Sequence, residues 1–324
     1  MVAVSTQKTN VPDQALLEEI DYWRKKRNAL ILAHNYQIPA IQDLADFVAD
    51  SLALSQKAAQ SPHDLIVLCG VHFMAESIAI FSPEKTVLIP DLDAGCSLAA
   101  SIDIAKLREW KAQYPNAVVV SYVNTTAEIK AESDYCCTSS NAVRVVEAIP
   151  ADKEIIFLPD MYLGAWVARE TRRKIHIYPG ECHVHAHARP QDVQEKLDAN
   201  PGAEFLVHPE CGCTSAVIYH IETGKISTDS AYILSTNGML DRARQSPAKE
   251  FVVATETGII HRLEKQNPGK TFTPLREDMV CQFMKMITVE KLLYTLKNLV
   301  YKVEVPPDIA AKARIPIERM LAIG

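Results

Sequence analysis

Three stretches of the sequence resemble one another, and this internal repetition constrains the fold more than any other feature. His34, Tyr122 and His208 each follow a short apolar run that is typical of a buried strand. His34 and Tyr122 lie 88 residues apart, and Tyr122 and His208 lie 86 apart. A repeat of this length is long enough to form a small α/β domain with its own sheet.

Each repeat contributes one cysteine that we predict to be a metal ligand: Cys96, Cys182 and Cys281. Helical patterns follow these cysteines, and a cysteine at a helix N-terminus has a lowered pKa and is available as a thiolate. Three thiolates suit a 4Fe-4S cluster with one open iron, or a zinc ion. A buried apolar thiol is the alternative for any one of them alone. The equivalent positions of Cys96 and Cys182, 86 residues apart, favour ligands.

The other five cysteines are weaker candidates. Cys69 lies inside an apolar run and is predicted to be a core residue. Cys136 and Cys137 are adjacent, so their side chains diverge. Cys211 and Cys213 form a C-x-C pair for which metal binding or redox switching stays open.

Apolar runs alternate with helical patterns along the whole chain, which predicts an α/β fold with parallel sheets covered by helices. If the repeats pack around a pseudo-threefold axis, the polar motifs after the strands converge on one central cleft, because ligands bind beyond the carboxyl ends of parallel strands. A leading helix is predicted at 13–28. The predicted divisions are 1–103, 104–190, 191–287 with an insertion near 211–234, and a helical segment 288–324 that can pack back on the first repeat.

Polar residues occupy corresponding positions at the strand ends and at the following helix starts. The strand-end set consists of proton-transfer residues and one amide: His34 and Tyr36, Tyr122 and Asn124, His208 and Glu210. The helix-start set consists of hydroxyl residues, which either cap a helix or bind an anion, and the two roles are compatible: Ser51, Ser139 and Thr236.

Three histidines alternate behind Cys182, namely His183, His185 and His187. In an extended chain they would share one face with zinc-ligand spacing. If the chain turns after Cys182, His185 is the best placed of the three.

Charge and hydropathy exclude several classes of function. The net charge of −6, without a basic stripe, argues against a nucleic-acid partner. No apolar stretch is long enough for a membrane span, and the polar N-terminus is not a secretory signal. We therefore expect a cytoplasmic protein, in which disulfides are rare.

At these residues the chain resembles the quinolinate synthase family of iron–sulfur enzymes in NAD biosynthesis. The resemblance runs from about residue 15 to 305 and rests on AHNYQIPAIQDLADFVADSLALSQKA, AGCSLA, SYVNTTAEIKAESD, CTSSNA, PGECHVH, HPEC, STNGM, ATETGII and CQFMKMIT. It implies three similar αβα domains around a pseudo-threefold axis, with the active site and a 4Fe-4S cluster at the centre.

The resemblance also implies roles for particular residues. The cluster ligands would be Cys96, Cys182 and Cys281, with His185 near the cluster. Proton carriers would be Glu210, the principal base, and His208, Tyr36 and Tyr122. The implied substrate-binding positions are His34, Ser51, Tyr122, Val123, Asn124, Ser139, His208, Pro209, Glu210 and Thr236.

The implied reaction condenses iminosuccinate with dihydroxyacetone phosphate and releases quinolinate, phosphate and water. An aspartate oxidase or dehydrogenase that delivers iminosuccinate is the partner to be considered. This chain lacks the C-x-x-C-x-x-C variant around the third ligand, and the insertion near 211–234 separates it from some relatives. The alternatives are a zinc-dependent lyase or hydrolase, and a non-catalytic iron–sulfur redox sensor.

Overall fold

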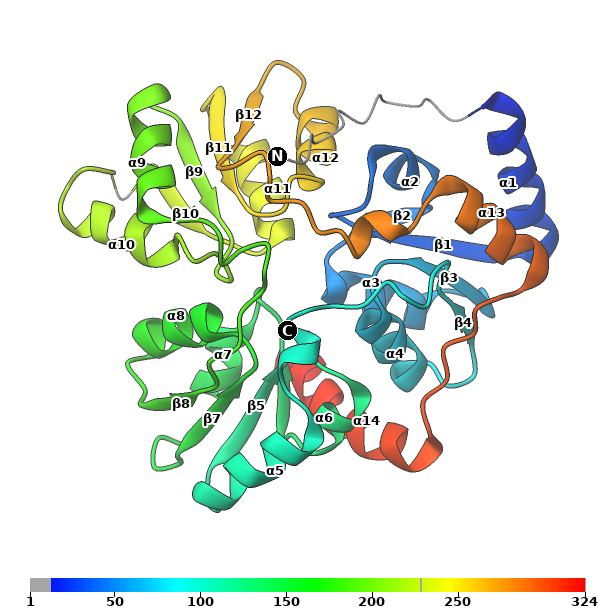
Figure 1. Ribbon diagram of the computed structural model, residues 1–324, viewed down its shortest axis with the longest axis horizontal. Helices are drawn as coiled ribbons and strands as arrows, with labels where there is room; N and C mark the ends of the chain where they lie inside the picture. The colour runs from blue at the N-terminus through cyan, green and yellow to red at the C-terminus, as the bar shows by residue number, and fades with distance from the viewer. Residues whose placement is uncertain (1–12, 228, 324) are drawn as a thin grey trace, which may run out of the picture.

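The computed structural model describes residues 13–227 and 229–323 and contains three four-stranded parallel sheets (Figure 1). The strand orders are β2-β1-β3-β4, β6-β5-β7-β8 and β10-β9-β11-β12, so the same topology occurs three times. Helices lie on the sheets, and the three units surround a common centre (Figure 1). The predicted α/β fold of three similar αβα units is confirmed, while the division points between units stay predictions.

The first sheet shows why the apolar runs become strands. All six residues of β1 are buried, which requires cover on both faces of the sheet. Asp13 caps the leading helix by accepting a hydrogen bond from the Ala15 N–H, as the sequence predicts. In chain order the elements are α1 (Gln14–Arg27), β1 (Ala29–His34), α2 (Pro39–Leu44), β2 (Phe47–Ala49), α3 (Ser51–Gln60), β3 (Leu65–Cys69), α4 (His72–Phe81), β4 (Thr86–Leu88) and the 3₁₀ turn η1 (Ala99–Ser101).

The second sheet follows the same plan, with a shorter helix α7 of six residues where the first unit has the ten-residue α3. Cys136 and Cys137 lie in its edge strand β6 and are fully buried, as Cys69 is in β3. The elements are α5 (Ile104–Gln113), β5 (Val118–Tyr122), α6 (Ala127–Ala131), β6 (Tyr135–Cys137), α7 (Ala142–Glu147), β7 (Ile155–Leu158), α8 (Met161–Thr171) and β8 (Ile175–Ile177).

The third unit has a longer connection between its strands β9 and β10, where the sequence predicts an insertion. Between β9 and β10 the chain forms α10, which has nine residues, whereas α2 and α6 at the equivalent positions have six and five. The elements are α9 (Pro190–Ala199), β9 (Glu204–Val207), α10 (Thr214–Glu222), β10 (Ala231–Ile233), α11 (Thr236–Gln245), β11 (Glu250–Ala254), α12 (Ile259–Gln266), β12 (Thr271–Pro274) and the 3₁₀ turn η2 (Met284–Met286).

Two closing helices, α13 (Val289–Asn298) and α14 (Pro307–Ile323), lie against different units. Helix α13 packs against α1 of the first unit. Helix α14 packs mainly against α6 and β6 of the second unit and also contacts α4 of the first. Arg319 donates to the Asp134 carbonyl at 2.7 Å, and Arg314 to the Ile80 carbonyl at 2.8 Å. The C-terminal segment therefore joins two units rather than returning only to the first.

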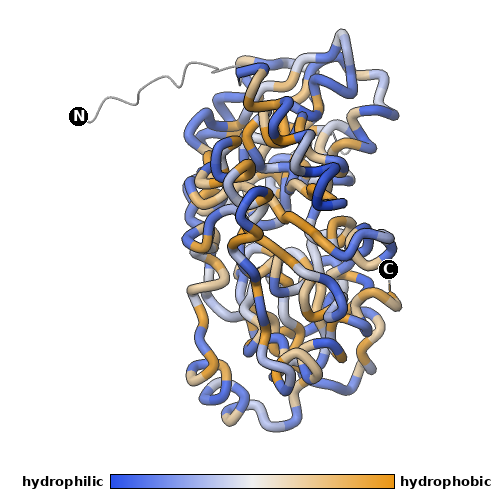
Figure 2. The backbone as a smooth tube through the Cα atoms, turned by 90° about the vertical axis from the view of Figure 1, so that its right-hand side faces the viewer, coloured by the Kyte–Doolittle hydropathy of each residue, from blue (hydrophilic) through white to orange (hydrophobic). Residues whose placement is uncertain are grey.

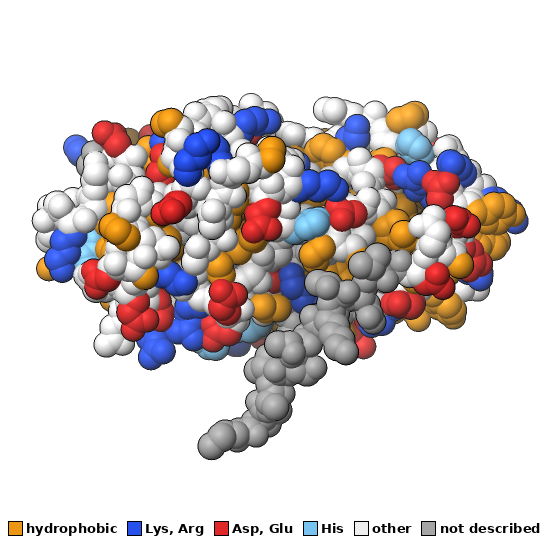
Figure 3. Space-filling model, turned by 90° about the horizontal axis from the view of Figure 1, so that it is seen from above, with side chains coloured by type: hydrophobic (Ala, Val, Ile, Leu, Met, Phe, Trp, Pro, Cys, Tyr) orange, Lys and Arg blue, Asp and Glu red, His pale blue; other side chains and the backbone are white. Residues whose placement is uncertain are grey.

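The surface and interior divide by polarity in the usual way. Hydrophobic residues form continuous stretches through the middle of the molecule (Figure 2). On the face in Figure 3, acidic and basic side chains are interspersed. No helix within the described ranges is long and apolar enough to cross a membrane.

Candidate active site

The carboxyl ends of β1, β5 and β9 point to one central cavity. Its volume is about 70 Å³, whereas one water needs roughly 10–15 Å³. The cavity can therefore hold a small ligand. Pro209 is buried outside the lining, while the other predicted site residues line it: His34, Tyr36, Ser51, Cys96, Tyr122, Val123, Asn124, Ser139, Cys182, His185, His208, Glu210, Thr236 and Cys281.

The two strand-end histidines are held in the same way. The Tyr36 N–H donates to Nδ1 of His34 at 3.2 Å, and the Glu210 N–H donates to Nδ1 of His208 at 3.4 Å. Burial disfavours the charged rings and lowers the pKa of His34 to about 3 and that of His208 to about 4. Each neutral ring therefore carries its proton on Nε2.

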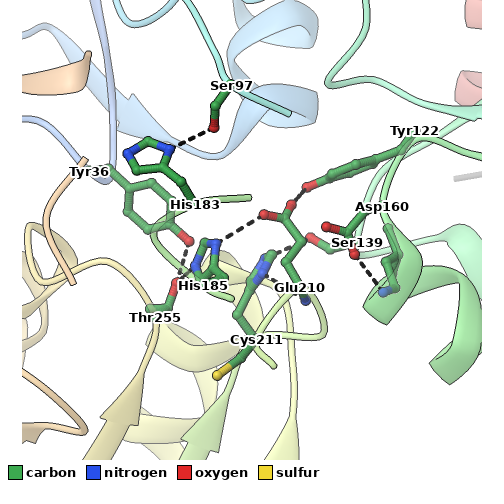
Figure 4. Close-up of polar contacts among 12 residues, drawn as sticks. Tyr36, Ser97, Tyr122, Ser139, Asp160, His183, His185, Glu210, Cys211 and Thr255 are labelled. Carbon is green, nitrogen blue, oxygen red and sulfur yellow. Dashed lines mark hydrogen bonds and ion pairs between the residues drawn. The ribbon is translucent and has the colours of Figure 1, made fainter. Parts of the chain in front are cut away.

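Glu210 is the centre of the polar network in the cavity (Figure 4). The Tyr122 hydroxyl donates to its Oε1 in a short hydrogen bond, and Nδ1 of His185 lies 3.2 Å from Oε2 as an ion pair. Burial alone would raise the pKa of Glu210, but the adjacent rings of His208 and His185 and the Tyr122 donor lower it to about 2. Glu210 is therefore an ionised base beside an O–H donor.

His185 carries the opposite charge. Burial opposes its protonation, but the neighbouring sulfur of Cys182 and the Glu210 carboxylate outweigh burial and raise its pKa to about 10. Of the three alternating histidines, His185 is buried, His183 lines the cavity, and His187 is exposed. The chain turns after Cys182, with the Ala186 N–H bonded to the Cys182 carbonyl, so the zinc-like common face does not form.

Thr255 joins two predicted site residues, Tyr36 and His185, although the sequence reasoning did not select it. Its Oγ1 lies 2.5 Å from the Tyr36 hydroxyl and 2.9 Å from Nε2 of His185. Thr255 directly follows β11, within the strand-end motif TETG. Its place after a buried strand is the signal that could have identified it.

Asp160 is a second residue that the sequence reasoning missed. Its side chain is fully buried near Ser139 and Glu210 (Figure 4), and Oδ1 accepts from the Leu163 N–H at 2.7 Å. Burial, followed by the charge of Glu210, raises the pKa of Asp160 well above its usual range. Oδ2 has no hydrogen-bond partner among the described residues, and the raised pKa favours the protonated, neutral form of this acid.

The helix-start hydroxyls do not cap their helices. Asp50 and Ser235 are the N-cap residues of α3 and α11, so Ser51 and Thr236 occupy the first helical positions. Ser139 precedes the α7 cap, Asn141, and lies 3.2 Å from Nε2 of His208. The capping interpretation is therefore wrong, and all three hydroxyl residues face the cavity instead.

Each of the three cysteines begins a single turn of chain. An N–H four residues later donates to the carbonyl of Cys96, Cys182 and Cys281 at 3.0, 2.9 and 3.2 Å. The long helices begin later, at α5 and α13. The predicted lowering of the thiol pKa is wrong for the metal-free protein, since burial raises all three, that of Cys96 to about 12.

The donor set around the cavity fits a metal group. The three thiols are free and half-buried. A buried thiolate is stable only when a cation compensates its charge, so a metal group is the partner that such a site requires. Glu256 is fully buried and accepts from the Cys281 N–H at 2.9 Å, with Lys285 at 2.8 Å from the same carboxyl oxygen. This contact fixes the turn that carries the third thiol.

A second donor set overlaps the first. Cys182, His185 and Glu210 offer one ligand atom each within 4.8 Å of one another.

Outside the cavity, Cys211 and Cys213 are joined by a disulfide, with Cα atoms 5.1 Å apart, although no disulfide was expected. The turn before α10 brings the two Cα atoms within the range that a disulfide needs.

Comparison with known proteins identifies the family. A family model described as quinolinate synthetase A protein matches residues 18–322. A quinolinate synthase of Thermus thermophilus is 52% identical over 311 residues, which cover 96% of this chain and 98% of the relative. The Pyrobaculum aerophilum quinolinate synthase is 50% identical over 305 residues, with coverage of 94% and 98%. The chain belongs to the quinolinate synthetase A family of enzymes.

Proposed function

We propose that this chain is a quinolinate synthase that condenses iminosuccinate with dihydroxyacetone phosphate and releases quinolinate, phosphate and water. One observation carries the proposal: residues from three sheets bring an ionised base, proton donors, helix-start hydroxyls and three thiols into one cavity. The family names supply the product. We assign the enzyme to the cytoplasm and its supply of iminosuccinate to an aspartate oxidase or dehydrogenase.

We assign substrate binding to the cavity hydroxyls and imidazoles. His34 presents an Nε2–H donor, and Ser139 and Thr236 present hydroxyls at helix starts, all suited to carboxylate and phosphate oxygens. His208 acts through Ser139, which accepts its Nε2–H. The remaining members of the proposed binding set are Ser51, Tyr122, Val123, Asn124, Pro209 and Glu210.

Acid–base chemistry falls to Glu210 and its neighbours. The pKa of about 2 keeps the Glu210 carboxylate ionised, with its oxygens available as proton acceptors, and the adjacent Tyr122 hydroxyl is placed to donate a proton. His185 holds the other carboxylate oxygen and keeps the negative charge in place. Tyr36, bonded to Thr255, is the second hydroxyl acid of the cavity.

Cys96, Cys182 and Cys281 would hold a 4Fe-4S cluster with one open iron. When bound, the cluster supplies a Lewis acid that assists the loss of water. Glu256 serves this site by fixing the Cys281 turn through the Cys281 N–H.

A zinc-dependent lyase is the second candidate, because Cys182, His185 and Glu210 together provide a sulfur, a nitrogen and an oxygen ligand. Zinc would take Glu210 as a ligand and leave Cys96 and Cys281 without a role. Quinolinate synthesis uses all three thiols and leaves Glu210 free as a base.

Anaerobic purification and a product assay separate these proposals. We expect a brown protein with about four iron atoms per chain that forms quinolinate from the two substrates. A colourless protein with one zinc would support the second candidate. Bound iron without quinolinate formation would support a redox sensor and contradict the proposed function.

A further inference from the structure

Asn35 occupies a position that the repeat makes unusual. Within each strand-end triplet the middle residue is Asn35, Val123 or Pro209, so the first unit alone has a polar side chain there. Asn35 is fully buried and does not line the cavity. A buried amide needs hydrogen-bond partners, so its contacts show what it does.

The Asn35 side chain joins the third unit at two points. Nη1 of Arg262 donates to Oδ1 of Asn35 at 2.6 Å. Nδ2 of Asn35 donates to Oγ1 of Thr236 at 2.9 Å, with a longer contact of 3.4 Å to Oδ1 of Asn237. A guanidinium can only donate, so the amide oxygen must face Arg262 and the amide nitrogen must face Thr236.

This orientation decides what the Thr236 hydroxyl can do. Because its oxygen accepts from Asn35, its own proton must go to another acceptor. Threonines inside helices return that proton to a carbonyl four residues earlier, but Thr236 is the first residue of α11 and has no such carbonyl within the helix. Thr236 lines the cavity, which leaves a bound ligand as the acceptor.

We propose that Asn35, oriented by Arg262, is a positioning residue that directs the Thr236 hydroxyl to donate to an anionic oxygen of the substrate. This inference rests on the proposed function, in which Thr236 binds substrate. The acceptor is a carboxylate or phosphate oxygen of the substrate. A hydrogen-bond donor placed against Thr236 would instead be repelled by the Thr236 hydroxyl proton. Arg262 acts through the amide.

The second and third units make a comparable contact. Nδ1 of His208 accepts from the Glu210 N–H, so Nε2–H of the neutral ring donates to Oγ of Ser139. The Ser139 proton is then also free for the cavity. The Asn35 amide and the His208 ring thus each donate to a hydroxyl oxygen at a helix start, and each leaves the proton of that hydroxyl for an acceptor in the cavity.

A double-mutant cycle tests the proposal. Asn35→Asp keeps an oxygen for Arg262 but replaces the N–H donor with an acceptor, so Thr236 would donate away from the cavity. We expect kcat/KM to fall by about 10- to 100-fold, mainly through KM, as for Thr236→Val. Asn35→Asp placed in the Thr236→Val background should cost less than about twofold more.

Arg262 provides a second arm that does not alter the buried amide itself. Arg262→Lys retains a donor to Oδ1 and should keep most of kcat/KM. Arg262→Met releases the amide to turn and should raise KM. Asn267→Asp is the matched control for Asn35→Asp. Asn267 is also a buried amide, at the end of the helix that carries Arg262, and it donates to the Leu263 carbonyl outside the cavity. That control should leave KM unchanged.

The outcomes separate the inference from the function on which it rests. Independent, multiplicative losses in the cycle, or equal KM values for the two Arg262 variants, would overturn the positioning role. Normal kcat/KM in Thr236→Val would instead remove Thr236 from the binding site. If Asn35→Asp does not fold, the two Arg262 variants decide the question.

Discussion

Two hydrogen bonds between units each leave a hydroxyl proton available to the cavity, and they differ in the side chain that donates. At the first contact Asn35 donates to Thr236, and at the second His208 shares a hydrogen bond with Ser139. An amide side chain does not titrate, whereas the His208 imidazole does, with a pKa of about 4 in the folded protein. His208 also adjoins Glu210 and stacks on His185, with ring centroids 5.4 Å apart.

The difference separates binding from proton transfer within one pseudo-symmetric site. The Asn35 contact is supported by Arg262 and contains no proton-transfer residue. The His208 contact belongs to the network of Glu210, Tyr122 and His185. We therefore expect changes at the first contact to act on KM, and changes at the second to extend to kcat.

The largest effect is expected at the three proposed cluster ligands, which serve the whole cavity rather than either contact. Cys96→Ala, Cys182→Ala and Cys281→Ala should each abolish quinolinate formation and reduce bound iron, because each thiol is one of three ligands. Iron content and product would be measured on anaerobically purified protein. Cys69→Ala, which removes a fully buried thiol of β3, should keep both. Full iron in any ligand variant would exclude that cysteine.

Removal of the proposed base, Glu210, tests the network around the His208 contact, and we expect it to act on kcat. Glu210→Gln should lower kcat by about 10²- to 10⁴-fold with iron retained, because general acid–base catalysis contributes a factor of that size. Steady-state rates give the value. The matched control is Glu204→Gln at the start of β9, the strand that precedes Glu210, because the Glu204 carboxylate accepts hydrogen bonds from Arg242 and Ser246 outside the cavity. Unchanged turnover of Glu210→Gln would remove it from the role of base.

A smaller effect is expected at the second hydroxyl. Ser139→Ala should lower kcat/KM by about 10-fold, because a hydrogen bond to a charged ligand contributes about 1.5–3 kcal/mol. Ser140→Ala removes an exposed hydroxyl that bonds Thr138 and does not line the cavity, so it should behave like the parent. Equal kinetics for the two variants would mean that Ser139 does not meet the substrate.

The smallest effect concerns pH and stability. The pKa of His208 is about 4 in the folded protein and about 6.5 in an unfolded chain. Between those values the unfolded chain binds more protons, so stability is full above pH 6.5 and falls as the pH drops toward 4. His208 contributes at most about 1.4 kcal/mol per pH unit to this slope.

Urea unfolding of anaerobic protein between pH 7 and pH 5 measures the effect. His208→Gln should have a shallower slope than the parent, while Thr236→Val should keep the parent slope because its contact contains no titrating group. Parallel slopes for all three proteins would contradict the depressed pKa of His208.

The repeat in the sequence was sufficient to predict much of the site. It placed His34, Tyr122 and His208 at equivalent strand ends, and the structure brings all three to the cavity. Such positions are readable because alternating apolar runs and helices leave few topologies for parallel strands. Three of the edge strands, β2, β6 and β10, have three residues each and lie in no longer apolar run, so the sequence pattern did not indicate them.

What the sequence determined by itself was the type of each side chain and its place within a repeat. Only the tertiary structure decided the partners, because Asn35 and Thr236 are 201 residues apart in the chain, and Tyr36 and Thr255 are 219 apart. It also reversed the expected pKa shift of the cysteines, since a turn favours the thiolate locally but burial in the assembled cavity opposes it more strongly. Hydrogen-bond direction and charge depend on what surrounds a group, and that environment exists only once the three units are packed together.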